Sequence, residues 1–265
     1  MKHFTLSILL FVSIAIFSQE KYPKDYFRSP LDIPIVLGGT FGELRSNHFH
    51  AGIDIKTQGK EGLKVFSAAD GYVSRIKVQQ FGYGKAIYIT HPNGFTSVYG
   101  HLSKFADDIE KYVKSVQYKK EDYQTGNLYF NENQFPVKKG EVIAFSGDTG
   151  GSGGPHLHYE IRNTASENII NPLFFGLKVA DSKFPTIQGL KAYSLSEDAR
   201  INQQNKSFSI PIKNIGKGKY IADRISASGS IGFGINVFDR LDKASNKNGI
   251  YSLEMLVNAK RFYYL

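Results

Sequence analysis

The sequence has no cysteine and no tryptophan, and only two methionines among 265 residues. Without cysteine the chain has no disulfide framework, no thiolate metal site and no lipid-modified N-terminal cysteine. Long apolar runs are scarce too, because no stretch beyond the first 17 residues could span a bilayer. These absences exclude a disulfide-stapled scaffold and a multi-span membrane protein.

The N-terminus has the pattern of a secretory signal peptide. The basic start MKH precedes the apolar run FTLSILLFVSIAIF, which is followed by SQE. A membrane-spanning helix needs about 20 apolar residues, and this run is shorter. We expect residues 1–19 to be a signal peptide, so that the mature protein is exported to the periplasm or cell envelope and has no stable membrane span. An uncleaved anchor is the alternative, and the exact cleavage site stays open.

The composition is typical of a globular, β-rich protein. It includes 26 glycines, 20 phenylalanines and 16 tyrosines, which favour short strands and many turns. The formal net charge of +9 favours weak attraction to an anionic cell-wall or membrane surface. Because we expect export, nucleic acid is not an expected partner.

Strand patterns become dense after an extended lead-in at residues 20–37. Asp70-Gly71 and Asn93-Gly94 each separate two β-rich runs, and such dipeptides predict hairpins. The apolar spacing in FADDIEKYVKSVQYKK predicts a helix within an insert at residues 104–136. We therefore expect a mainly β domain over residues 38–178 that carries a helical insert.

A second domain is expected over residues 183–265. Ile231, Phe233, Ile235 and Val237 alternate with small or polar residues, which predicts a half-buried strand whose apolar side faces a core. We interpret this region as β-sandwich-like. The chain stops at Leu265 inside an apparent strand, which leaves open whether this domain is complete.

Two histidines stand close together in SGGPHLHYEIR. On a strand, His156 and His158 would share one face, while Leu157 and Tyr159 would lie on the other. Two imidazoles on one face can converge on a metal ion about 2 Å away. The pair alone is a weak signal, because a surface strand can carry two histidines by chance.

Two further motifs strengthen the metal interpretation. The segment HAGID places His50 and Asp54 at an even spacing in an apparently extended stretch, and His101 follows a strand in VYGHL. Two histidines and one aspartate, with a coordination position left open, are typical of a catalytic zinc site. The remaining histidines can transfer protons or stabilise an oxyanion.

The motifs HAGID, YGHLS and SGDTGGSGGPHLHYEIR, in this order, resemble the LytM/lysostaphin-type zinc metallopeptidases of peptidase family M23, which cut peptidoglycan peptides. The resemblance covers about Gly38 to Leu177 and includes VKKGEVIAFSG. It implies an antiparallel, LytM-like domain of the duplicated hybrid motif type and one zinc ion per chain. The residues that it assigns are His50, Asp54 and His158 as metal ligands, and His101 and His156 as catalytic residues.

The expected activity is hydrolysis of cross-links or stem peptides of peptidoglycan by a zinc-activated water. The alternative is a non-catalytic envelope module that binds wall or activates a separate amidase, although the chain keeps all five site positions. A metal-binding cupin-like oxygenase would leave HAGID and YGHL unexplained. The bond that is cut, the oligomeric state, autoinhibition and the role of the second domain stay open.

Other polar residues receive structural interpretations. We expect His48 in a solvated loop, His91 at a surface turn, and Asp148 and Thr149 as turn formers. The aromatic residues Tyr83 and Tyr99 are expected in the core or at the rim of a groove.

Overall fold

The computed structural model describes residues 22–264. The predicted signal peptide lies outside these residues. The described part is mainly β, with antiparallel strand pairs and the single α-helix α1, which confirms the predicted fold class. Within residues 22–264 no helix has the length and apolarity needed to cross a membrane.

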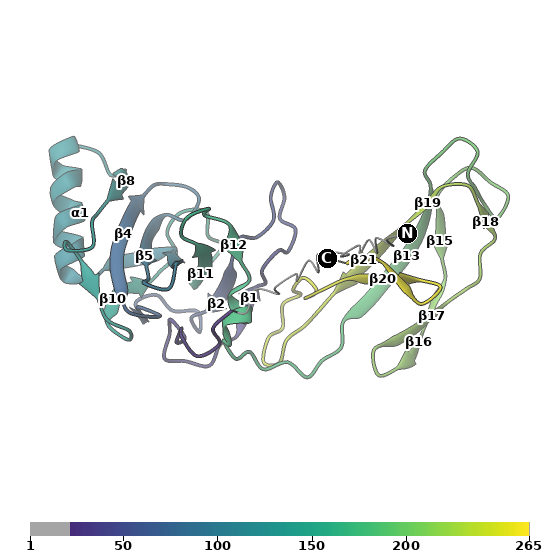
Figure 1. Cartoon of the computed structure of the whole chain (residues 1–265), viewed down its shortest axis with the longest axis horizontal. Coiled ribbons are helices and arrows are strands. Elements are labelled where there is room, and N and C mark those ends of the chain that lie inside the picture. Colours follow the sequence, from purple (N-terminus) through teal and green to yellow (C-terminus); the bar gives the residue numbers. More distant parts are fainter. Residues whose placement is uncertain (1–21, 265) are drawn as a thin grey trace, which may run out of the picture.

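The N-terminal part of the chain, residues 37–170, forms a nine-stranded sheet and a three-stranded sheet (Figure 1). The large sheet contains, in spatial order, β1 (Leu37–Gly39), β2 (Ile53–Lys56), β11 (His156–Asn163), β6 (Phe95–Gly100), β5 (Lys85–Thr90), β4 (Gly71–Val78) and β8 (Gly126–Tyr129), with β12 (Ile169–Ile170) beside β11 and β9 (Pro136–Val137) beside β4. The small sheet contains β3 (Lys64–Phe66), β10 (Val142–Ser146) and β7 (Leu102–Phe105). Side chains of both sheets, among them Tyr159 and Phe105, share one hydrophobic core.

One of the two predicted hairpins is correct. Strands β5 and β6 pair antiparallel across the Asn93-Gly94 turn, where Gly94 has a φ of 83°. The Asp70-Gly71 hairpin is wrong, because β3 and β4 belong to different sheets. The Asp70 carboxylate instead accepts a hydrogen bond from the Lys139 backbone at 2.7 Å. A Cβ at Gly71 would lie 2.3 Å from the Thr90 carbonyl oxygen, so glycine is needed there for close strand pairing.

The predicted helix is α1, Asp107–Lys120. It buries Ile109 and Val113 in the main core, and the Glu110 carboxylate accepts the Phe105 backbone N–H at 3.0 Å. After the helix, the chain adds β8 and β9 beside β4. A 3-10 helix, η1 (Pro172–Phe175), follows β12.

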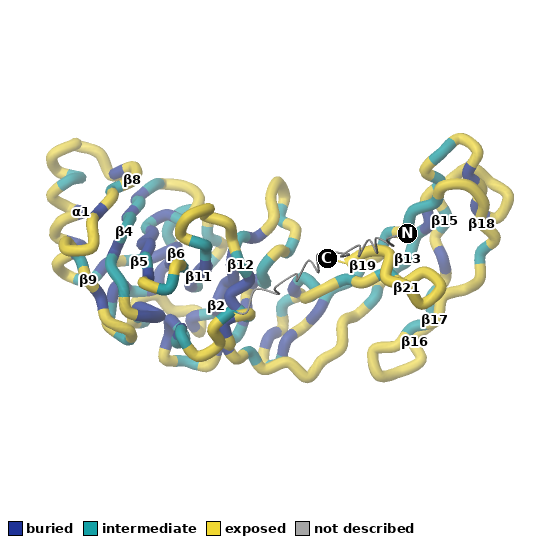
Figure 2. The backbone as a smooth tube through the Cα atoms, viewed as in Figure 1, coloured by how far each residue is buried: buried dark blue, intermediate teal, exposed yellow. Residues whose placement is uncertain are grey.

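The C-terminal part of the chain, residues 186–264, consists of small sheets. They are β15 (Phe208–Ile210), β13 (Thr186–Ser194) and β19 (Ile231–Phe238) in one sheet, and the pairs β14 (Arg200–Ile201) with β18 (Ala227–Ser228), β16 (Ile212–Gly216) with β17 (Lys219–Ala222), and β20 (Glu254–Val257) with β21 (Lys260–Tyr264). The predicted strand around Ile231 exists as β19. However, Phe233 and Ile235 are 46% and 36% exposed, so the expectation that they lie in a core is wrong. The remaining strands form separate pairs, and Figure 2 shows this C-terminal part as largely exposed.

One C-terminal segment packs against the N-terminal part. Leu241 and Ala244 are buried in the main hydrophobic core. Asn246 donates a side-chain hydrogen bond to the Gly38 carbonyl at 3.1 Å, and the Gly249 backbone N–H donates to Glu43 at 3.3 Å. The segment at residues 239–251 therefore completes the first core, although it lies more than 60 residues beyond η1.

The buried position of Leu241 generates a stability prediction. We expect Leu241→Ala to lower the free energy of unfolding by about 2–4 kcal/mol, because it leaves a cavity in the main core. Leu256→Ala is the matched control, since Leu256 is 57% exposed whereas Leu241 is 8% exposed. The measurement is urea unfolding followed by circular dichroism. Equal effects of the two substitutions would contradict the packing described.

Candidate metal and catalytic site

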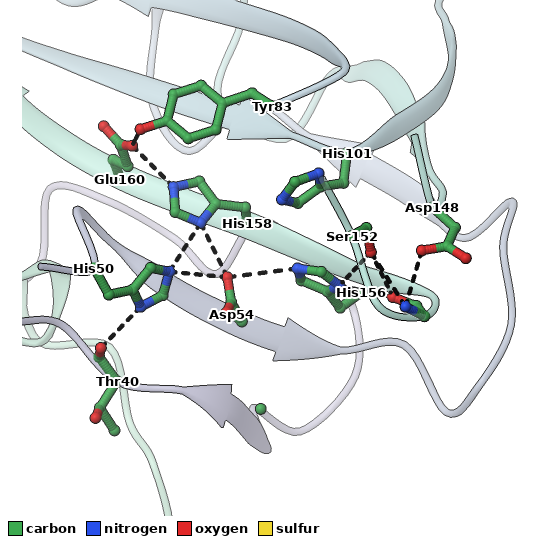
Figure 3. Close-up of polar contacts among 12 residues, drawn as sticks. Thr40, His50, Asp54, Tyr83, His101, Asp148, Ser152, His156, His158 and Glu160 are labelled. Carbon is green, nitrogen blue, oxygen red and sulfur yellow. Dashed lines mark hydrogen bonds and ion pairs between the residues drawn. The ribbon is translucent and has the colours of Figure 1, made fainter. Parts of the chain in front are cut away.

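Three potential ligand atoms converge at one end of β2 and β11. His50 Nε2 lies 3.1 Å from both Asp54 Oδ1 and His158 Nδ1, and the last two atoms are 2.9 Å apart (Figure 3). A tetrahedral metal with bonds of 2.0–2.1 Å separates its ligand atoms by roughly 3.3 Å. The size of this triangle therefore fits a metal ion, and the three residues form a buried His-Asp-His cluster that could hold one.

Strand register places two of these residues. Asp54 on β2 pairs directly with His158 on β11, and His158 pairs with Gly100 on β6. Leu157 is fully buried on the opposite face, as the alternation predicts. His50 differs from the expectation of one extended stretch, because β2 begins only at Ile53. A loop before the strand, rather than strand alternation, brings His50 to the site.

Hydrogen bonds to the far ring nitrogens fix the orientation of the two histidines. His50 Nδ1–H donates to the Thr40 carbonyl and His158 Nε2–H donates to Glu160, each at 2.8 Å. The nitrogens that face the site then present lone pairs toward each other and toward the Asp54 carboxylate. Such acceptor atoms repel one another unless a proton or a cation lies between them. The donor set therefore fits a metal ion in chemistry as well as in size.

The titration properties of these ligands agree with that arrangement. Burial would raise the pKa of Asp54, but hydrogen bonds from His156, His158 and His50 outweigh burial and hold the pKa far below its usual range. Burial would lower the pKa of His158, but Asp54 and Glu160 raise it to about 9. Without metal, a proton is thus held between His158 and Asp54. A metal ion bound at this position would displace that proton.

Glu160 contacts the site and was missed by the sequence analysis. Its side chain is 0% exposed and accepts hydrogen bonds from His158, from the Tyr83 hydroxyl and from Arg162 Nε at 2.6 Å. Burial would raise the pKa of Glu160, but His158 and Arg162 lower it to about 2. The Tyr83 ring also stacks on the His158 ring, with centroids 4.8 Å apart. Strand alternation could have revealed Glu160, since it lies two residues beyond His158 on β11.

Arg45 is a second residue that the sequence analysis missed. Its guanidinium lies 2.8 Å from Asp54 Oδ2 and 2.8 Å from Glu43 Oε1. Asp54 is therefore held through one oxygen, while Oδ1 faces the histidines. Glu43 also accepts the Gly249 backbone N–H, which links the C-terminal segment at 239–251 to a ligand of the site.

His101 and His156 lie beside the cluster, with ring centroids 4.7 Å apart. His101 Nδ1–H donates to the Thr149 carbonyl and His156 Nδ1–H donates to the Gly154 carbonyl, each at 2.8 Å. Both Nε2 atoms are left free of these bonds, and His156 Nε2 lies 3.5 Å from Asp54 Oδ1. His101 has a φ of 58°, a strained backbone conformation of the kind found at active sites. The structure thus brings together all five predicted site residues.

The two histidines differ in protonation. Burial lowers the pKa of His101 to about 4, although the hydrogen bond to Thr149 opposes this effect. Burial would also lower the pKa of His156, but its contacts with Asp54 and the Gly154 carbonyl outweigh burial and raise the pKa. At neutral pH His101 is neutral, whereas His156 holds a proton more readily.

The remaining polar predictions have mixed outcomes. The prediction for His91 is wrong, because its ring is buried and hydrogen-bonded to the Asp70 carbonyl and Ser97 hydroxyl. His48 is exposed, as expected. The Asp148 carboxylate accepts the Gly154 backbone N–H at 3.0 Å and so shapes the glycine loop that carries His156.

Comparison with known families matches residues 48–120 and 123–172 to the model described as peptidase family M23. Residues 48–172 of the chain are therefore similar to peptidase family M23. The matched residues include all five members of the site. The description of the matched family indicates a hydrolase that cuts peptide bonds.

Curated relatives show the same similarity. The chain is 34% identical over 134 residues to the DD-carboxypeptidase/endopeptidase Mpg of Neisseria meningitidis serogroup B, covering 51% of this chain and 24% of that protein. It is 31% identical over 145 residues to the peptidoglycan DD-endopeptidase ShyC of Vibrio cholerae, covering 52% of this chain and 27% of that protein. The chain thus spans only about a quarter of the length of these relatives.

A solved structure of Csd3 from Helicobacter pylori also matches. The sequences are 30% identical, and the match covers 60% of this chain and 35% of that chain with a TM-score of 0.40.

The contact between Glu160 and His158 generates a prediction about metal affinity. We expect Glu160→Gln to weaken zinc binding about 10–100-fold, because the charged partner that orients the ligand is lost. Competition with a zinc chelator measures the dissociation constant, and circular dichroism checks the fold. Glu61→Gln is the control, since Glu61 is exposed. Unchanged zinc affinity in Glu160→Gln would show that Glu160 does not support metal binding.

Proposed function

We propose that this protein is a zinc-dependent endopeptidase that hydrolyses peptide cross-links or stem peptides of peptidoglycan. The observation that carries the proposal is the convergence of His50, Asp54 and His158, with His101 and His156 beside them. In this proposal the first three residues hold one zinc ion, and the last two act on the substrate. The family M23 match supports this assignment.

The proposed chemistry uses the two histidines outside the ligand set. A zinc ion held by the cluster would lower the pKa of a bound water toward 7 and polarise the peptide carbonyl. His101 is neutral at pH 7, and its Nε2 can accept a proton or hydrogen-bond to the substrate. His156 has a raised pKa and can donate a proton to the leaving amine or stabilise the oxyanion. Hydrolysis by this route forms no covalent bond to the chain.

The names of two relatives support the proposed substrate and location. ShyC is described as a peptidoglycan endopeptidase, and DipM of Caulobacter vibrioides, 27% identical over 139 residues, as a cell division protein. We therefore place the protein in the periplasm or cell envelope, with wall peptide as its substrate. A non-catalytic envelope module is not favoured, because each of the five site positions holds a residue suited to its role.

Peptidoglycan digestion tests the activity directly. Protein from Glu20 onward is incubated with intact peptidoglycan, and mass spectrometry identifies the released fragments. We expect cross-linked dimers to disappear, a chelator to stop this loss, and zinc to restore it. Absence of cleavage with one zinc ion bound per chain would contradict the enzyme assignment and favour a wall-binding or activating module.

Single substitutions separate the two proposed roles. We expect His158→Ala to remove both zinc and activity. His156→Ala should keep zinc bound while lowering kcat by about 10²–10⁴-fold, as expected for loss of general acid–base catalysis. His48→Ala is the matched control, since the His48 side chain is exposed and hydrogen-bonds to the neighbouring Asn47. Full activity of His156→Ala would show that His156 is not a catalytic residue.

A further inference from the structure

The face of the large sheet that carries the site continues along β11. His156, His158, Glu160 and Arg162 occupy alternate positions on this strand and therefore point to the same side. Arg162 lies four residues beyond His158, which corresponds to roughly 13 Å along a strand. A chain lying on this face could reach both His158 and Arg162.

Strand register brings a second arginine to this face. Glu160 pairs with Val98 on β6, Val98 with Tyr88 on β5, and Tyr88 with Arg75 on β4. Residues paired across a sheet share a face, so Arg75 lies on the same side as the site. The edge strand β8 adds Tyr129 directly beside Arg75.

Arg75 and Arg162 line a cavity of about 170 Å³ on this face. The Arg75 guanidinium stacks 3.8 Å above the Tyr88 ring, and the Arg162 guanidinium lies 5.7 Å from it. The side chains of both arginines are only 15–16% exposed, so they are held in place by packing. The cavity volume is several times the ~30 Å³ that a water molecule occupies in the liquid, which leaves room for a carboxylate.

The Glu167 carboxylate already lies between the two arginines of this cavity. Glu167 Oε2 lies 3.1 Å from Arg75 and 3.2 Å from Arg162. The Glu167 side chain is 54% exposed and projects from a loop residue with a φ of 54°. An exposed loop carboxylate can be exchanged for that of a ligand at little cost, because exposed ion pairs contribute little stability. Planar guanidiniums in pairs are well suited to bind carboxylates.

We propose that the pocket between Arg75 and Arg162 binds a free carboxylate of the peptide whose bond is cut at the metal site, in place of Glu167. This inference rests on the proposed function and names its substrate class. At ~3.3–3.6 Å per extended residue, the carboxylate belongs about four residues from the cleaved bond. Peptides that carry a carboxamide at this position bind more weakly, because an uncharged amide cannot form the charge-assisted pair.

The test compares a cross-linked muropeptide dimer that has free carboxylates with the same dimer whose carboxylates are converted to carboxamides. Wild-type protein should show a higher kcat/KM for the free dimer. In Arg75→Gln the ratio of kcat/KM between the free and amidated dimers should fall about tenfold, because a charge-assisted hydrogen bond is lost. Glu167→Gln should change the ratio in the opposite direction, since it removes the competing carboxylate. Opposite effects exclude misfolding as their common cause.

Arg28→Gln is the matched control. Arg28 also stacks on an aromatic ring, 4.6 Å from Phe66, and pairs with the exposed Asp32. Arg28 lies beside β3 rather than on the face with the metal site, so its substitution should leave the ratio at the wild-type value.

Calorimetric titration with both dimers separates this inference from the proposed function, because binding needs no turnover. Tighter binding of the free dimer, lost in Arg75→Gln, would support the pocket even if neither dimer were cleaved. Cleavage of both dimers at equal kcat/KM, with no effect of Arg75→Gln, would contradict the proposed carboxylate pocket. The proposed endopeptidase activity would still be supported by that result.

Discussion

The site depends on one buried carboxylate, that of Asp54. Three histidines face its Oδ1 atom at 2.9–3.5 Å, and Arg45 holds its Oδ2 atom at 2.8 Å. Removing this charge would take one partner from each of these groups, which is costly where the group is buried. Strand β1 also lies close to this carboxylate, because a Cβ at Gly39 would lie 2.6 Å from Asp54 Oδ2. Glycine at position 39 therefore leaves room for the Asp54 side chain. The backbone, the ligands and the positioning residues are thus arranged around a single anion.

The fold was predictable where local signals agreed with the tertiary structure. Asn93-Gly94 forms a hairpin because both flanking strands belong to one sheet, whereas the equally strong signal at Asp70-Gly71 lies where the chain passes between two sheets. Dipeptide patterns do not encode which sheet a strand joins. The exposure of Phe233 was unpredictable for a related reason, since alternation shows which residues share a face but not whether another sheet covers it.

The site was predictable to the extent that its residues cluster in motifs. His156 and His158 follow from strand alternation, and family resemblance supplied the roles of His50, Asp54 and His101, which the structure brings together without testing those roles. Arg45 was missed, and the contact of Tyr83 with His158 was not predicted, because both contacts arise from loops whose paths the sequence does not reveal. His91 was assigned to the surface because it borders a turn, but its ring points into the core.

A row of interacting polar and charged groups crosses the sheet from Gly249 in the C-terminal segment to Arg75. Gly249 donates to Glu43, Glu43 pairs with Arg45, and Arg45 holds Asp54. On β11 the order continues from His158 to Glu160 and Arg162, and through Glu167 to Arg75. Each buried charge in this row is shared by neighbours of opposite sign, which offsets the cost of burial. Neighbouring charges of opposite sign therefore extend the charged face of the sheet beyond the His-Asp-His cluster as far as Arg75.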